Sequence, residues 1–144
     1  MTDIPDYDSG NIFAKILRGE IPCAKIFEDD AALAFMDIFP QSEGHALIIP
    51  KRAKATSLFD VPEAELKTLI AAVQKVARAV DRALKPNGLR IMQLNGSDAG
   101  QSVFHIHFHV IPVYSGRALR PHAAGKPADA AALNELATKI AAAL

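Results

Sequence analysis

Cysteine is scarce in this sequence, where Cys23 stands alone among 144 residues. A single cysteine excludes an intramolecular disulfide and any cysteine-based zinc site within one chain. Net charge is missing too, because 16 lysine and arginine residues balance 16 aspartate and glutamate residues. No overall attraction to nucleic acid or to an anionic membrane is therefore expected, and any bound anion must be held by local donors.

Long hydrophobic runs are absent as well. No segment approaches the about 20 apolar residues that cross a bilayer. The acidic start of the chain, residues 1–6, lacks the basic and apolar regions of a signal peptide. The composition, 50% hydrophobic and 22% charged, is typical of a globular protein with one core. We expect a single domain located in the cytoplasm.

Hydrophobic spacing predicts five strands and three helices. The strands are expected at residues 24–28, 31–37, 46–49, 89–94 and 104–111. The helices are expected from an Asn11 cap to Gly19, from an Asp60-x-x-Glu63 capping pattern to residue 84, and from an Asp129 cap to the C-terminus. Clustered strands with short links favour an antiparallel sheet, and so an α+β fold, over repeated β-α-β units.

Three histidines alternate with apolar residues in the last predicted strand. Side chains of a strand point to its two faces in turn, so His105, His107 and His109 share one face. We call these three residues the histidine row. Its neighbouring members lie about 6.6 Å apart along the strand, and the apolar residues between them face the core.

Three functions compete for the histidine row. Imidazoles are common zinc ligands, but three along a straight strand span about 13 Å, whereas a zinc ion holds its ligands at about 2.0–2.1 Å. A purely structural role needs a hydrogen-bond partner for each ring, and histidine is not a preferred strand residue. A neutral imidazole can instead attack phosphorus while its neighbours donate hydrogen bonds to phosphate oxygens. We favour this third function.

The loop before the strand supports phosphate chemistry. Residues 95–102, Asn-Gly-Ser-Asp-Ala-Gly-Gln-Ser, offer backbone N–H groups, hydroxyls and amides beside the histidine row. Such a loop can hold an anion without a net positive charge. Taken alone, it would only indicate a polar connection between two strands.

The residues from 105 to 111 resemble the His-φ-His-φ-His-φ-φ signature of the histidine triad (HIT) superfamily, and the chain is most similar to its HINT branch of purine-nucleotide-binding hydrolases. Other segments resemble that branch in the same order, including residues 12–16, 19–22, 34–38, 48–51 and 99–103. On this basis we expect a loose N-terminus over residues 1–10, a HIT domain over 11–118, and a C-terminal extension with a helix over 119–144.

The resemblance implies a five-stranded antiparallel sheet that continues across a homodimer. It also implies a two-step reaction with no metal and no cofactor. His107 would attack the α-phosphorus of a nucleoside phosphoramidate or a related conjugate, and water would then release a mononucleotide from the nucleotidyl-histidine. His109 would hold a phosphate oxygen, and His105 would order the histidine row.

The binding roles are implied by the resemblance too, with a purine nucleotide or nucleotide conjugate as the partner. Gln101 and Ser102 would contact the phosphate or the leaving group, and Asn95 would lie close by. Asp37 would bind the ribose hydroxyls through its carboxylate. An apolar slot for the base would be formed by Ile12, Phe13, Ile16 and Ile38.

Two departures from the family pattern bear on activity. Ala53 stands where many relatives carry a fourth histidine, which leaves open a nucleotide-binding or regulatory protein with little catalysis. Asn11 and Ala14 stand where several bacterial relatives carry a zinc-binding cysteine pair, so no such site is expected. Outside the histidine row, we expect His45 to be structural, with a bond to a loop carbonyl, and His122 to lie on the surface.

Overall fold

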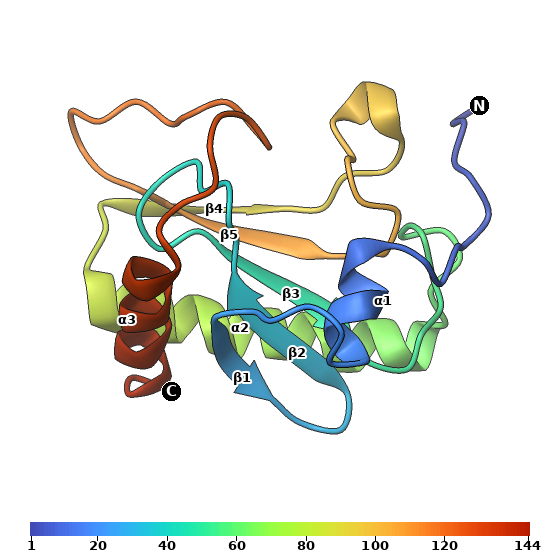
Figure 1. The fold of residues 1–144 in the computed structure, drawn as a ribbon, viewed down its shortest axis with the longest axis horizontal. Coiled ribbons are helices and arrows are strands. Elements are labelled where there is room, and N and C mark those ends of the chain that lie inside the picture. Colours follow the sequence, from blue (N-terminus) through green and yellow to red (C-terminus); the bar gives the residue numbers. More distant parts are fainter.

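The computed structural model describes residues 1–144 as an α+β fold built on one sheet (Figure 1). The five strands lie in the order β1-β2-β3-β5-β4, and all neighbouring pairs are antiparallel. The predicted fold class is therefore confirmed. The elements are α1 (Ile12–Leu17), β1 (Lys25–Glu28), β2 (Ala32–Met36), β3 (Ala46–Pro50), α2 (Glu63–Leu84), β4 (Gly88–Met92), a short 3-10 helix (Ser97–Ala99), β5 (Phe108–Val113) and α3 (Ala130–Ala141).

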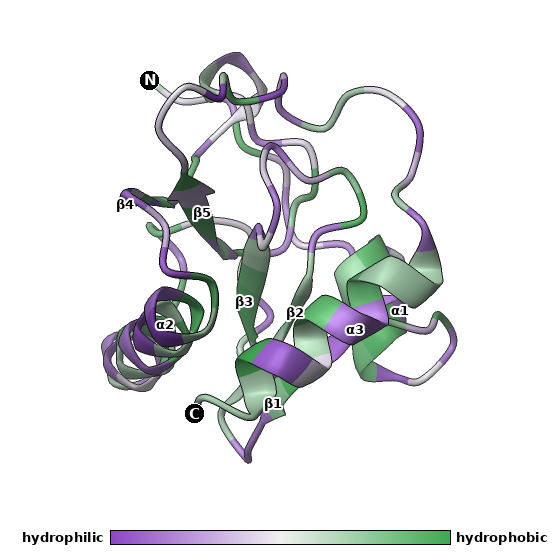
Figure 2. Ribbon diagram, turned by 90° about the vertical axis from the view of Figure 1, so that its left-hand side faces the viewer, coloured by the Kyte–Doolittle hydropathy of each residue, from purple (hydrophilic) through white to green (hydrophobic).

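Alternation along the central strands divides the apolar side chains between two cores. Ala34 and Ile48 belong to a core that α2 and α3 cover. Phe35 and Leu47 point the other way, into a smaller core with Phe13 of α1. Figure 2 shows α2 and α1 on opposite sides of the sheet. Both faces of the sheet are therefore buried.

Helix α2 is the longest element, with 22 residues. Leu69, Val73, Val76 and Val80 are buried along one of its sides, while charged residues occupy the other side. This distribution is the amphipathic pattern expected of a helix that covers a sheet. No helix of the structure, α2 included, has both the length and the apolar content to span a membrane.

The caps predicted for the first and last helices are confirmed. The Asn11 side chain accepts a hydrogen bond from the Ala14 N–H at 2.9 Å, and the Asp129 carboxylate accepts one from the Ala132 N–H at 3.0 Å. Helix α3 ends at Ala141, so Leu144 lies beyond it and stays 42% exposed.

The capping role predicted for Asp60 is wrong. The residue before α2 is Pro62, which makes no capping bond through its side chain. The Asp60 carboxylate instead accepts hydrogen bonds from the backbone N–H groups of Thr56 and Ser57, at 3.0 and 2.8 Å. Asp60 lies too far from the first helical turn, and it closes the preceding loop instead.

The strand with the histidines is shorter than predicted, because β5 begins at Phe108. His105 and His107 precede it in a segment whose Ile106 N–H bonds to the carbonyl oxygen of Ala55 at 2.8 Å. His109 lies within β5 and is the register partner of Leu47. Cross-strand partners share a face, so His109 lies on the same side of the sheet as α1.

Candidate active site

A cavity of ≈ 270 Å³ lies on the α1 side of the sheet, beside the histidine row. Most of its lining is hydrophobic, which is usual for a small-molecule site with a few polar groups. The structure brings most of the predicted site residues together here. Those that line the cavity are Ile12, Phe13, Ile16, Asp37, Ile38, Ser102, His107 and His109.

A backbone carbonyl determines which ring nitrogen of His107 carries the proton. Its Nδ1 lies 2.7 Å from the carbonyl oxygen of His105, and a carbonyl only accepts, so Nδ1 carries the proton. Burial lowers the pKa of His107 to about 4, so the ring is neutral at pH 7. The lone pair is then on Nε2, which makes no hydrogen bond within the chain, while Phe13 packs edge-on against the ring at 4.9 Å. This is the form of an imidazole that can act as a nucleophile.

His105 lies behind His107 and does not line the cavity. Its Nε2 lies 3.3 Å from the carbonyl oxygen of Pro50, so Nε2 donates and Nδ1 accepts. The hydroxyl of Tyr7, from the N-terminal segment, donates to that Nδ1 at 2.8 Å. Burial lowers the pKa of His105 to about 4. His105 thus acts through its backbone carbonyl, which sets the tautomer of His107.

Two successive hydrogen bonds determine the tautomer of His109. The backbone N–H of Gln41 donates to Nδ1 of His45 at 3.0 Å, so the neutral His45 ring carries its proton on Nε2. That Nε2 donates to Nδ1 of His109 at 2.9 Å, which leaves the proton of His109 on its own Nε2. Burial lowers the pKa of His45 to about 4 and that of His109 to about 2. The Nε2–H of His109 is buried and has no partner.

The loop expected to bond His45 does so, but through an N–H group instead of a carbonyl. The ring nitrogen that faces the loop is therefore an acceptor. Gly44 lets the chain turn sharply just before this residue, with φ +94°, and an added Cβ there would clash with Cδ1 of Leu84. The tight turn at Gly44 thus places His45 immediately before β3.

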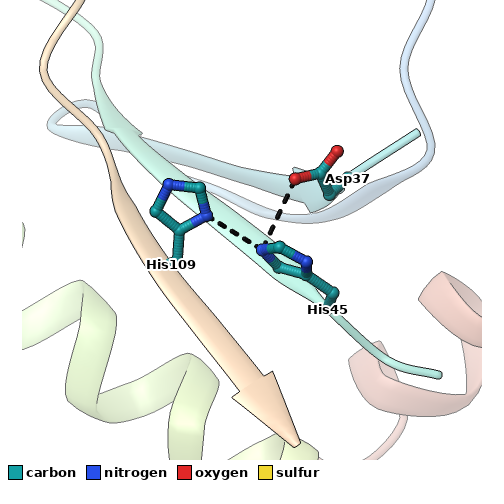
Figure 3. A group of neighbouring side chains, drawn as sticks. All are labelled: Asp37, His45 and His109. Carbon is teal, nitrogen blue, oxygen red and sulfur yellow. Dashed lines mark hydrogen bonds and ion pairs between the residues drawn. The ribbon is translucent and has the colours of Figure 1, made fainter. Parts of the chain in front are cut away.

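Asp37, His45 and His109 form a cluster whose ligand atoms all lie within 4.8 Å of one another (Figure 3). Such a cluster could hold a metal ion, but the hydrogen bonds oppose this. His45 accepts at Nδ1, so its Nε2 keeps a proton and has no lone pair for a metal. Asp37 accepts from the Phe39 N–H at 2.8 Å and lies 3.4 Å from His45 Nε2. Burial raises the pKa of the Asp37 carboxyl.

The structure does not bring Gln101 or Asn95 to the cavity. The buried Gln101 amide accepts from the Gly96 N–H at 2.8 Å and donates to the Thr56 carbonyl at 2.7 Å. The Asn95 side chain accepts from the Leu58 N–H at 2.8 Å. These contacts hold the loop of residues 95–102 in shape.

Two positions outside the histidine row bear on the site, residue 122 at the cavity and residue 53 in the core. His122 was expected on the surface, which is wrong: its ring lies 5.2 Å from that of His109, and it lines the cavity. No sequence pattern around residue 122 signals this, because only the path of the chain after β5 brings it there. Ala53 is 5% exposed and belongs to the core that α2 covers.

The chain is similar to known proteins in both sequence and structure. The family model described as HIT domain matches residues 18–116. The chain is 42% identical to an adenosine 5′-monophosphoramidase of Schizosaccharomyces pombe, over 70% of this chain and 72% of that protein. It is 37% identical to an adenylylsulfatase of Arabidopsis thaliana, over 77% of this chain and 59% of that protein. The crystal structure of a HIT-like protein from Bartonella henselae, with an unknown ligand, superposes with a TM-score of 0.91 at 44% identity, covering 97% of this chain and 100% of that one.

Proposed function

The chain belongs to the HIT domain family, and we propose that it hydrolyses nucleoside phosphoramidates or related nucleotide conjugates through a nucleotidyl-histidine. The observation that carries this proposal is the state of His107. A neutral ring with its lone pair on Nε2, beside a cavity, is equipped to attack phosphorus.

In the first step, Nε2 of His107 forms a bond to the α-phosphorus while the bond from phosphorus to the leaving group breaks. The leaving group takes the bonding electron pair and picks up a proton from the solvent. The phosphorylated ring carries a positive charge, which the carbonyl oxygen of His105 stabilises by accepting from Nδ1–H at 2.7 Å. In the second step, the oxygen of a water molecule bonds to phosphorus while the bond from phosphorus to Nε2 of His107 breaks. The water releases a proton to the solvent, the mononucleotide leaves, and Nε2 regains its lone pair.

The neighbours of His107 stabilise the charge on the phosphoryl group. The Nε2–H of His109 donates to a non-bridging oxygen, a role supported by the absence of any partner for that atom within the chain. Ser102 lines the same cavity, and its hydroxyl contacts the leaving group. Gln101 and Asn95 contribute by holding the loop that carries Ser102.

The nucleoside lies on the apolar side of the cavity. Asp37 accepts hydrogen bonds from the ribose hydroxyls, and its position at the end of β2, 12% exposed, leaves the carboxylate within reach of a ligand. The purine base packs in the slot formed by Ile12, Phe13, Ile16 and Ile38. Apolar contacts discriminate weakly between bases, so we expect both adenine and guanine nucleotides to bind.

The proposal extends to assembly and location. We propose a cytoplasmic homodimer in which the sheets join through β4, because β1, the other edge strand, packs against α3. We also propose that residues 11–118 form the HIT domain and that residues 119–144 form an extension to it.

The test is rapid mixing of the protein with adenosine phosphoramidate and with adenylyl sulfate, followed by intact-mass measurement. We expect a transient gain equal to one adenylyl group, steady release of AMP, and neither with His107→Ala. The substituted protein should still bind AMP. A wild-type chain that binds AMP but shows no adduct and no turnover would instead support a nucleotide-binding protein, the function that Ala53 keeps open.

A further inference from the structure

The chain between β5 and α3 doubles back before it enters α3 (Figure 1). We call residues 114–129 the C-terminal segment. Backbone hydrogen bonds attach it to the loop after β2: the Arg120 N–H donates to the Gln41 carbonyl at 2.8 Å, and the Ala128 N–H donates to the Ile38 carbonyl at 2.8 Å. The Gln41 side chain also donates to the Arg120 carbonyl at 3.0 Å. The segment is therefore held next to Asp37.

Between these attachment points, His122 is the inward-facing residue. Among residues 120–127 it is the only one that is not exposed. The next residue, Ala123, has φ +50°, a backbone conformation that residues other than glycine, asparagine and aspartate seldom adopt. Strained backbone of this kind persists where the surroundings require it, and it often marks a ligand site.

The ring of His122 has hydrogen-bonding capacity that the chain does not use. It stands at 73° to the ring of His109, with centroids 5.2 Å apart. Both of its nitrogens are shielded from solvent without a partner, and so is Nε2 of His109. Most buried polar side-chain atoms do have partners. Each of these two adjacent rings can therefore donate an N–H to a ligand in the cavity, which indicates a ligand with acceptor oxygens.

The residues that line the cavity show which side chains can bind such a ligand. No lysine or arginine lines it, so Ser102 and the imidazoles are the side chains that can donate to an anion. His107 is assigned to the bond with phosphorus, which leaves His109 and His122 as the ring donors. Asp37 is the acidic lining residue and is a poor neighbour for an anion unless a donor lies between them.

We propose that His122 binds a non-bridging phosphate oxygen of the nucleotide together with His109, so that the C-terminal segment completes the site. The inference rests on the proposed function and adds to it a phosphate-binding residue from outside the family match at residues 18–116. Nucleotides should accordingly bind better than the corresponding nucleosides, and the difference should depend on His122.

The test uses three variants of the 144-residue chain, each with a single substitution. His122→Phe keeps a ring but removes its nitrogens, His122→Gln keeps a donor, and Lys126→Ala is a control at an exposed position of the same segment. Isothermal titration with AMP and with adenosine gives the phosphate contribution of each variant. We expect His122→Phe to weaken AMP binding about tenfold or more with adenosine binding unchanged, since a charge-assisted hydrogen bond is lost. His122→Gln should recover part of the loss, and Lys126→Ala should match the wild type.

Other outcomes overturn the inference in distinguishable ways. If His122→Phe weakens AMP and adenosine binding equally, or leaves both unchanged, His122 is only part of the cavity wall, while the proposed function stands. If the wild type binds neither compound and releases no AMP from the phosphoramidate, the proposed function fails and this inference fails with it. Thermal unfolding of each variant confirms that the binding measurements compare folded proteins.

Discussion

His45 determines which nitrogen of His109 carries a proton. The two rings meet at 2.9 Å, Nε2 to Nδ1, and the other nitrogen of His45 accepts from the backbone N–H of Gln41. The backbone N–H of Gln41 thus determines which nitrogen carries the proton in His45 and, through His45, in His109. This series of hydrogen bonds leaves a proton on Nε2 of His109, and we propose that this N–H donates to a phosphate oxygen.

Replacing His45 should therefore impair both stability and turnover. His45→Leu leaves the Gln41 N–H and Nδ1 of His109 without partners, which should lower the free energy of unfolding by about 1–3 kcal/mol. With His109 free to change tautomer, kcat should fall about tenfold or more, the equivalent of about 1.4 kcal/mol in the barrier. His45→Gln retains a donor and should lose less. Denaturant unfolding and steady-state kinetics check this, and equal kcat in all three proteins would contradict it.

Two tyrosines offer a matched test of the N-terminal segment. The Tyr7 hydroxyl bonds Nδ1 of His105, and the Tyr114 hydroxyl bonds the Glu43 carbonyl, each at 2.8 Å. Tyr7→Phe and Tyr114→Phe should each lower the free energy of unfolding by about 0.5–1.5 kcal/mol. Only Tyr7→Phe should also reduce turnover, because His105 sets the position of His107. The idea fails if the two variants are equally active.

Stability should decline as the solution becomes acidic. Burial lowers the folded-state pKa of His45, His105 and His107 to about 4 and that of His109 to about 2, against about 6.5 in an unfolded chain. Below pH 6.5 the unfolded state therefore binds protons first, and stability that is complete above this pH is lost as the pH falls toward 4. The loss approaches about 1.4 kcal/mol per pH unit for each histidine. Urea unfolding at pH 5, 6, 7 and 8 measures it, and a flat profile would show that these rings are not buried in the neutral form.

The proposed dimer makes a prediction about β4. Ile91 lies on this edge strand and is 45% exposed. A lysine there would bring two like charges together if the edges of two chains pair. We expect Ile91→Lys to be monomeric by light scattering at micromolar concentration, whereas Leu144→Lys, a control at another exposed apolar residue, should stay dimeric. A monomeric wild type would contradict the proposal.

Local sequence patterns predicted the fold well where the physics is local. The strands predicted at residues 31–37 and 46–49 are present as β2 and β3, because short apolar runs bounded by turn residues are a local signal of buried strands. The Asn11 and Asp129 caps were found because a cap needs only its own first turn. Asp60 was misassigned because the N–H groups of Ser57 and Thr56, three and four residues earlier, bind the same carboxylate.

The candidate site was only partly accessible from sequence. The alternation correctly places His107 and His109 together at the cavity, but it fails for His105, which does not line it. The tautomers depend on Pro50 and Gln41, which are remote in sequence. His122 belongs to no motif, and its approach to His109 depends on how the C-terminal segment crosses the loop after β2. Long-range backbone contacts of this kind leave no periodic signal.

Tyr7 and His122, from either side of the family match at residues 18–116, both contact the histidine row, and this affects how the protein can be trimmed. A fragment cut to residues 18–116 would lose Tyr7, His122 and all of α3, whose Ile140 is fully buried against the sheet. Subcloning to the boundaries of the family match would thus yield a protein with an uncovered hydrophobic face and with the proposed catalytic histidine lacking part of its surroundings.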